Sequence, residues 1–234
     1  MSEALRVLMD DVTRCRACPR LVAWREEVGR VKRASFRGEE YWARPVPGFG
    51  DPEARLLVLG LAPAAHGANR TGRIFTGDRS GDFLYAALYR AGLASQPTSV
   101  GRGDGLALRD VWVTSAVKCA PPANKPLPAE RDACAAWFHG ERRLLPRVRV
   151  VLCLGGFAWD AALRLLRAEG VALPQPLPRF GHGVVAPVAR APTLVGAYHP
   201  SQQNTFTGRL TPAMMDEVLA RVREMIGDEA TPEA

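Results

Sequence analysis

Short apolar runs alternate with amphipathic segments along most of the chain. Four runs rich in β-branched residues predict buried parallel strands, and they cover residues 55–60, 111–117, 148–154 and 193–198. Segments with apolar residues at helical spacing lie between and after these runs, at residues 82–91, 129–145, 158–169 and 212–226. This alternation predicts an α/β fold of three layers, in which helices cover both faces of a small, central, mainly parallel four-stranded sheet.

The length and composition predict one domain. A chain of 234 residues with 47% hydrophobic residues is long enough for one well-formed core, and we expect this domain to cover residues 1–226. Residues 227–234 carry no apolar pattern, and we expect a disordered tail. No apolar run is long enough to cross a membrane, and residues 1–10 lack a secretory pattern. We therefore expect a cytoplasmic protein that acts as a monomer.

The formal net charge of +7 favours a polyanionic partner such as nucleic acid. Only three of the 31 basic residues are lysines, so a general preference for arginine accounts for part of the excess. The basic residues are also scattered, and a solvated basic surface is an alternative to a binding face.

Four of the five cysteines form a split pattern that indicates a metal or iron-sulfur site. Cys15 and Cys18 are spaced as Cys-x-x-Cys, and Cys119 and Cys134 follow about a hundred residues later. In a reducing compartment, thiols grouped in this way are better explained as ligands than as disulfides.

Four thiolates suit either tetrahedral zinc or a 4Fe-4S cluster. Zinc ribbons usually have two Cys-x-x-Cys pairs, and this chain has only one, so the pattern favours the cluster with zinc as the alternative. The structural alternative is that Cys119 and Cys134 are ordinary buried side chains. Cys153 lies inside an apolar run, and we assign it to the core.

Unusual residues follow three of the predicted strands, at the edge where α/β sheets bind ligands. Residues 60–78 form a long loop with several glycines that lacks the Gly-Lys-Ser/Thr ending of a phosphate-binding P-loop. Residues 118–126 place Cys119 beside a polar loop, so the predicted metal site and pocket are neighbours. His199 follows the last strand, a position that favours a functional histidine over an incidental one.

Taken together, these motifs resemble the iron-sulfur uracil-DNA glycosylases over residues 15–212. The resemblance rests on the cysteine spacing, Gly60-Leu-Ala-Pro63, Gly72-Arg-Ile-Phe-Thr-Gly77, Lys118-Cys-Ala-Pro-Pro-Ala-Asn124 and His199-Pro-Ser201. Family 5, the UDGb type, is the most similar branch, because family 4 has glutamate at the position of Leu61 and asparagine at that of Ser115.

The resemblance implies a DNA repair enzyme that flips a deaminated base out of the duplex and hydrolyses its N-glycosidic bond. Phe75 would stack on the base, and His199 would hydrogen-bond the base O2 as negative charge develops there. Asp78 would activate water or stabilise the sugar cation, and Asn124 would contact the base or the water. The base-binding residues would be Phe75, Gly60, Ala62 and Ser115.

Other implied roles concern DNA and the cluster. The residues expected to contact DNA are Arg73, Lys125, Ser201, Gln202, Gln203, Asn204 and Arg209. The implied 4Fe-4S ligands are Cys15, Cys18, Cys119 and Cys134, and the cluster is expected to be structural. Ser115 is too short to pair with uracil as an amide does, and Leu61 replaces a carboxylate, so we expect a roomier, less polar pocket with hypoxanthine and xanthine as further substrates.

Several alternatives stay open at this point. In these alternatives, Asp78 merely caps a helix that begins near Ser80, Phe75 is a core aromatic, and Asn124 merely forms part of a turn. A zinc-stabilised nucleic-acid-binding protein without catalysis would also explain the charge and the cysteines. A nucleotide hydrolase would need more carboxylates for magnesium, and a Cys-His hydrolase would need a more accessible thiol than Cys153.

Overall fold

A computed structural model describes residues 1–227, and the tail expected at residues 227–234 lies outside them apart from Gly227. A sheet of six strands occupies the middle, in the order β1-β3-β2-β4-β6-β5. The strands are β1 (Phe49–Gly50), β2 (Leu56–Gly60), β3 (Val111–Ser115), β4 (Val150–Leu154), β5 (Val185–Ala186) and β6 (Thr193–Ala197). The α-helices are α1 (Glu3–Arg14), α2 (Pro19–Val31), α3 (Ala68–Thr71), α4 (Arg79–Arg90), α5 (Pro128–Arg143), α6 (Gly156–Ala168), α7 (Gln202–Phe206) and α8 (Pro212–Ile226). Two 3-10 turns, η1 (Ala34–Phe36) and η2 (Pro122–Asn124), complete the described elements.

The four central strands are the predicted ones, and they pair in parallel as β3-β2-β4-β6. The prediction of four strands was incomplete, because β1 and β5 add an antiparallel edge on each side. Each of these edge strands has only two residues, too few to show an alternating pattern in the sequence.

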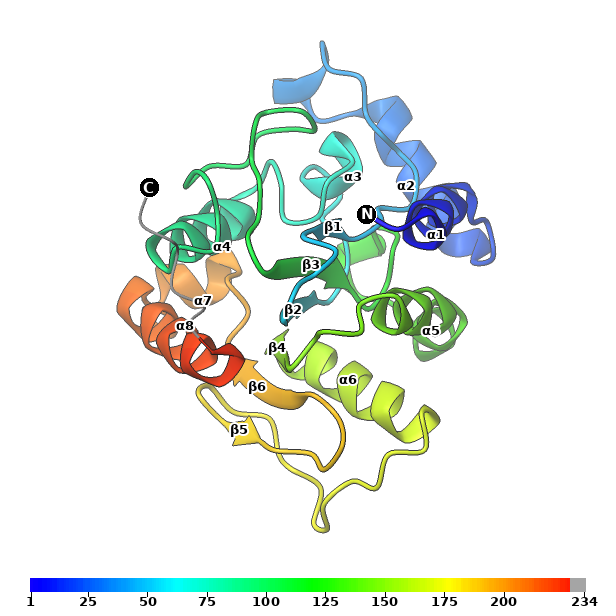
Figure 1. Ribbon diagram of the computed structural model, residues 1–234. Coiled ribbons are helices and arrows are strands. Elements are labelled where there is room, and N and C mark those ends of the chain that lie inside the picture. The colour runs from blue at the N-terminus through cyan, green and yellow to red at the C-terminus, as the bar shows by residue number, and fades with distance from the viewer. Residues whose placement is uncertain (228–234) are drawn as a thin grey trace.

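Alternate residues of the central strands face opposite layers, and the predicted three-layer α/β fold is confirmed. Val58 and Leu152 pack with residues of α4 and α8, whereas Leu57 and Val151 pack with residues of α5 and α6. Figure 1 shows α4 and α8 on one side of the sheet and α1, α5 and α6 on the other. Cys153 is fully buried in the second layer, as predicted.

The strand order places a crevice at the end of β2. From β2 the chain goes first to β3 on one side, and from β3 it crosses over to β4 on the other side. Loops that leave neighbouring parallel strands in opposite directions open a crevice at their carboxyl ends, where α/β proteins bind ligands. The loop from Leu61 to Asp78 begins at this point.

A buried ion pair joins β3 to the helix layer. The Lys118 ammonium lies 2.8 Å from the Glu141 carboxylate on α5, and both side chains are buried. Thr114 donates to the same carboxylate at 2.6 Å, and the backbone N–H of Gly48 donates to its other oxygen at 3.0 Å. The charges are therefore compensated by hydrogen bonds as well as by each other, which a buried pair requires.

None of the helices in residues 1–227 is both long enough and apolar enough to span a membrane.

Candidate active site and cysteine pocket

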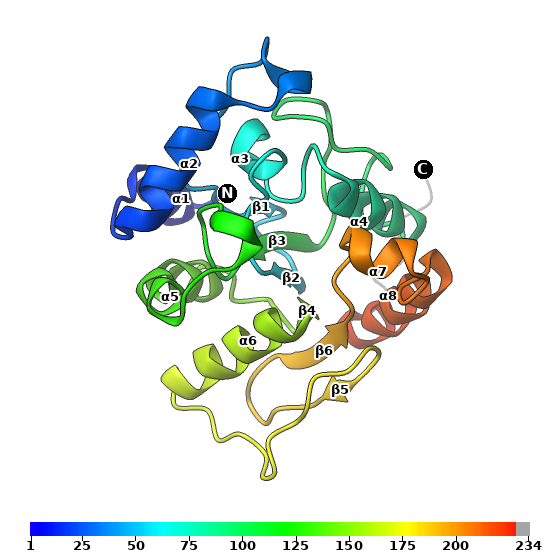
Figure 2. The same cartoon turned by 180° about the vertical axis from the view of Figure 1, so that it is seen from behind.

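A cavity of about 430 Å³ opens at the carboxyl ends of the central strands. Its volume lies in the range of pockets that bind small ligands. The loop after β2, the start of α4, η2 and the segment after β6 all contribute to its wall. The lining residues are Leu61, Ala62, Pro63, Ala64, Ile74, Phe75, Asp78, Ser80, Ala123, Asn124, His199, Ser201 and Gln203. In Figure 2, α7 and η2 lie on either side of the carboxyl ends of the strands.

Phe75 and His199 form the aromatic part of the wall. Their ring centroids are 5.8 Å apart, with an angle of 35° between the ring planes. Phe75 lies directly over Gly60, where an added Cβ would be 2.7 Å from two carbons of the ring. Phe75 also has a positive φ of 50°, an unfavourable backbone conformation that is often found at functional sites. Gly60 therefore acts by leaving room for the ring rather than by lining the cavity.

His199 lies just after β6 and is half-buried, and desolvation of its imidazole lowers the pKa to about 4. The ring is therefore neutral near pH 7 and carries one N–H donor. No hydrogen bond to either ring nitrogen is made by any of residues 1–227, and the donor is available to a ligand. The side-chain amide of Asn204 donates to the His199 carbonyl at 2.8 Å, which fixes the backbone there.

Asp78 both caps α4 and lines the cavity. Its Oδ1 accepts from the Gly81 N–H at 3.0 Å. The capping interpretation is therefore correct, and the cap uses this one oxygen. Its Oδ2 lies against Gly67, where an added Cβ would come within 2.1 Å. Burial raises the pKa of Asp78, because it disfavours the charged carboxylate more than the backbone hydrogen bonds favour it.

Asn124 reaches the cavity from η2, on the far side from Asp78. It is exposed, and both Ala123 and Asn124 have a positive φ, of 52° and 56°. The turn interpretation is therefore correct, and the contact of Asn124 with the base or water stays a prediction that its place in the cavity lining allows. Lys125 follows directly and is also exposed.

Two of the residues predicted for the site do not fit their expected roles. The hydroxyl of Ser115 is buried and donates to the Val117 carbonyl at 2.9 Å, so Ser115 does not line the cavity. Arg73 is also buried, and it bonds Asp104, Ser99 and Thr76. With its guanidinium fully engaged, Arg73 does not face a phosphate, and its expected DNA contact is wrong for this structure.

The segment after His199 supplies the remaining predicted residues. Ser201 and Gln203 line the cavity, and Gln202 and Arg209 are exposed beside it. The guanidinium of Arg209 lies 4.6 Å from the ring centroid of Tyr198, which holds it near the surface. The sequence patterns did not single out Ala64 or Ser80 as cavity residues, because neither carries a distinctive motif.

The four predicted ligand cysteines line one small pocket. Cys15 and Cys18 lie between α1 and α2, Cys119 follows β3, and Cys134 is on α5. Within residues 1–227, no group of three or more His, Cys, Asp or Glu side chains is arranged to hold a metal ion. Four thiolates on one zinc ion would lie about 3.8 Å apart, given a Zn–S distance of about 2.3 Å. The structure thus brings the cysteines together without forming a closed single-ion site.

The surroundings of the pocket act in opposite directions on the charge of the sulfurs. Burial raises the pKa of Cys119 to about 11 and that of Cys134 to about 12, so both thiols are protonated unless a cation is bound. Yet Arg25, only 2% exposed, donates to Cys119 Sγ at 2.9 Å, and its Nε has no partner. The carboxylate of Glu26 is 3.9 Å away, too far for a hydrogen bond. Among neutral thiols, the buried guanidinium therefore has only this one distant carboxylate of residues 1–227 to compensate its charge.

Comparison with known proteins agrees with this geometry. Residues 47–223 match the model of the uracil DNA glycosylase superfamily. The chain belongs to this superfamily.

Among its relatives, a type-5 uracil-DNA glycosylase from Mycobacterium bovis is 58% identical over 92% of this chain and 79% of its own length. One from Thermus thermophilus is 56% identical over 92% of this chain and 95% of its own length. A type-4 uracil-DNA glycosylase from Pyrobaculum aerophilum is 33% identical, over 56% of this chain and 60% of its own length. This superfamily member is thus more similar to these type-5 relatives than to the type-4 one, as the residues at positions 61 and 115 predicted.

Proposed function

We propose that this protein is a hydrolase that removes uracil from DNA by cleaving the N-glycosidic bond, which leaves an abasic site. The observation that carries the proposal is that His199, a half-buried and neutral imidazole with no hydrogen bond to its ring from residues 1–227, lines the same cavity as Phe75 and Asp78. Its membership of the uracil DNA glycosylase superfamily and the names of its relatives support the choice of base.

The cavity accounts for how a base is held. A base cannot be reached inside the duplex stack, so it rotates out into the cavity. The Phe75 ring offers a flat apolar face for stacking, and stacking of this kind accepts different bases. The backbone at Ala62 and the side chain of Asn124 lie on the rim and supply polar contacts.

His199 supplies the interaction that is strongest in the transition state. As the N-glycosidic bond breaks, its electron pair moves to the base and negative charge appears on O2. A neutral imidazole N–H that is already in place stabilises this charge without reorganisation, and the water-poor cavity strengthens the interaction. A charged imidazolium is not required, in agreement with the low pKa of His199.

Asp78 acts on the other fragment. The leaving base turns the sugar into a cation, which the carboxylate stabilises or to which it directs a water molecule. The cap to Gly81 holds the side chain by one oxygen and leaves Oδ2 for this role. Water adds to the sugar carbon and the base departs with the electron pair and a proton, so the reaction is a balanced hydrolysis.

The cavity also fits substrates beyond uracil. Leu61 places an apolar side chain in the lining of the cavity, where a polar one would select for uracil. We propose hypoxanthine and xanthine as further substrates. Since Ser115 does not reach the cavity, Leu61 carries this argument alone.

We further propose that Cys15, Cys18, Cys119 and Cys134 hold a 4Fe-4S cluster, with zinc as the alternative. The buried Arg25 fits a group that keeps the sulfurs negatively charged, and the backbone N–H of Lys118 donates to Cys134 Sγ at 3.2 Å as in sulfur-ligated sites. A bound cluster supplies cross-linking between the α1–α2 junction, the β3 loop and α5, and none of the proposed chemistry passes through it. We propose that the protein acts on DNA with deaminated bases, as a monomer in the cytoplasm.

Replacing His199 tests the mechanism. His199→Ala is expected to lower the single-turnover rate on uracil-containing duplex by about two to three orders of magnitude, because one donor to developing charge is removed. Its dissociation constant for DNA should change little. His139→Ala, on α5 and outside the cavity, is the control and should cleave like wild type. An unchanged rate for His199→Ala would remove this residue from the mechanism.

Replacing the cysteines tests the cofactor. Purified protein is expected to be brown and to contain iron, and Cys15→Ala or Cys134→Ala should lose the colour and most of the soluble yield, since a metal site contributes folding free energy. Cys153→Ala is the matched control, because Cys153 lies in the core away from the pocket, and it should keep its iron. Stoichiometric zinc without iron, in protein purified without oxygen, would contradict the cluster.

The substrate range is tested with duplexes that carry uracil, hypoxanthine or xanthine, followed by alkali to cut abasic sites. All three bases are expected to be released, and mispaired lesions should react faster because they cost less to flip. Release of uracil alone, with hypoxanthine untouched under single-turnover conditions, would show that the Leu61 argument is wrong.

A further inference from the structure

A basic loop lies beside the cavity, and none of the motifs of the sequence includes it. It runs from Lys32 to Arg37 and contains η1. Arg33 and Arg37 are exposed, and no carboxylate in residues 1–227 lies within ion-pair distance of either. Several arginines near the cavity are paired, as Arg73 is with Asp104, so Arg33 and Arg37 are among the guanidinium groups that an external anion can reach.

The loop is fixed to the wall of the cavity by two sets of contacts. The Tyr41 hydroxyl accepts from the Arg33 N–H at 3.4 Å and bonds His66 Nδ1 at 3.0 Å. His66 belongs to the same loop as Ala64 and Asp78, which line the cavity. The arginine is close enough to act on this ring, since the pKa of His66 is lowered by burial first and then by the charges of Arg33 and Arg70.

Arg70 on α3 makes the second set of contacts. Its guanidinium lies 3.9 Å from the ring centroid of Phe36, pairs with Glu39, and donates to the carbonyls of His66 and Gly77. All of this ties the loop to the segment that carries Asp78. Arg70 is thereby engaged as an anchor, and the exposed cations of the loop that remain for an external anion are Arg33 and Arg37.

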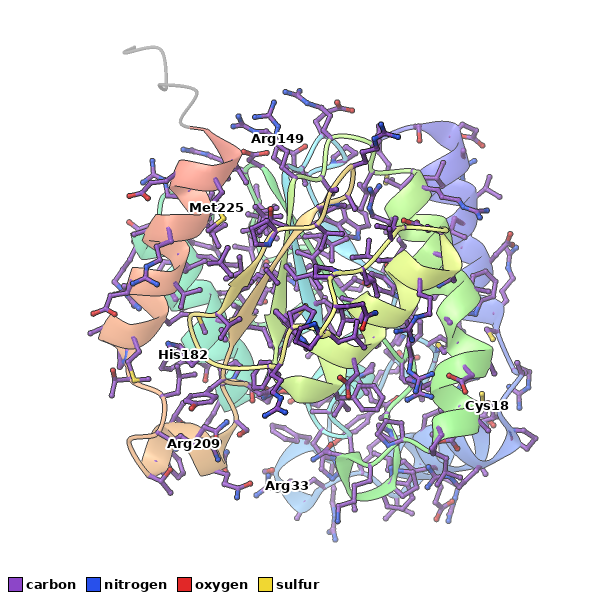
Figure 3. The ribbon with its side chains drawn as sticks, turned by 90° about the horizontal axis from the view of Figure 1, so that it is seen from below. Cys18, Arg33, Arg149, His182, Arg209 and Met225 are labelled. Atoms are coloured by element: carbon purple, nitrogen blue, oxygen red, sulfur yellow. The ribbon has the colours of Figure 1, made fainter. Side chains whose placement is uncertain are left out.

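The basic loop and Arg209 lie at the same end of the molecule. Figure 3 shows Arg33 and Arg209 at one end and Arg149, which precedes β4, at the opposite end. The first end is therefore the one at which the carboxyl ends of the strands and the cavity lie. Arg209 comes from the segment after α7, and Arg33 comes from the segment after α2.

We propose that the loop from Lys32 to Arg37 binds backbone phosphates of the DNA, so that Arg33 and Arg37 grip the duplex on the side of the cavity opposite Arg209. The inference rests on the proposed function, since it assumes that the cavity end faces DNA. Arginine suits this role because its planar guanidinium pairs with phosphate through two N–H groups. Because the loop is attached to the segment that contains His66, its position relative to the cavity is fixed. Phosphates bound by the loop would therefore place one nucleotide at the entrance of the cavity.

Salt dependence of binding is the direct test, because each phosphate that the protein neutralises releases counterions. Binding of the full-length protein to an undamaged duplex is measured over a range of salt concentrations. In Arg33→Ala/Arg37→Ala, the slope of log Kd against log salt is expected to fall by about one for each phosphate that is no longer neutralised, about two in all. Arg33→Lys/Arg37→Lys keeps the charges and should retain most of the slope.

The matched control removes the same charge elsewhere. Arg164→Ala/Arg167→Ala takes two exposed arginines from α6, which runs away from the cavity edge, and should leave the slope unchanged. The single-turnover rate of Arg33→Ala/Arg37→Ala at saturating uracil-containing duplex should equal that of wild type, because neither residue lines the cavity.

The proposal is overturned if the slope of Arg33→Ala/Arg37→Ala equals that of wild type, or if the control pair lowers it equally. Failure of the proposed function gives a different result. In that case wild-type protein would release no base, yet its binding to undamaged duplex would still show whether the slope depends on Arg33 and Arg37.

Discussion

The desolvation of one neutral imidazole, that of the half-buried His199, is the constraint on which the active end of this protein depends. The residue lies at the carboxyl end of β6, packs against Phe75, and has its backbone carbonyl held by Asn204. Gly155, at the end of β4, lies beneath it, where a Cβ would be 3.4 Å from that of His199. Phe75 in turn needs Gly60 below it and a left-handed backbone. The sheet edge thus places a partly desolvated donor at the cavity, which suits stabilisation of developing charge.

The cysteine pocket and the cavity are coupled through the segment after β3. Cys119 and Asn124 lie five residues apart on it, and Lys118 anchors it to Glu141 on α5, the helix that also carries Cys134. A group bound by the four cysteines would therefore restrain the loop that presents Asn124 without reaching the base. Together with the buried ion pair, such a group would give this loop a rigidity that the exposed turn at η2 does not have by itself.

The sequence predicted the parts of the fold that depend on local pattern. Helix α8 was placed at its observed residues, and the four parallel strands were found to within two residues at each end, because each is a continuous apolar run. Side-chain direction was less predictable. Arg73 was expected at DNA, but its direction is set by Asp104, thirty-one residues later, and by Ser99. Ser115 turns to a carbonyl two residues away. Arg33 and Arg37 were missed because only the folded anchors at Tyr41 and Arg70 bring their loop to the cavity.

The pKa of His199 is the measurement that tests the account most directly. Desolvation in the cavity lowers it to about 4, well below the ordinary value of about 6.5. An NMR titration of the histidine ring signals, assigned by comparison with His199→Ala, should show this ring neutral from pH 8 down to about pH 5. Titration of His199 near pH 6.5 would mean that the ring is solvated and partly charged at working pH, and it would contradict the central claim that desolvation holds a neutral donor for the departing base.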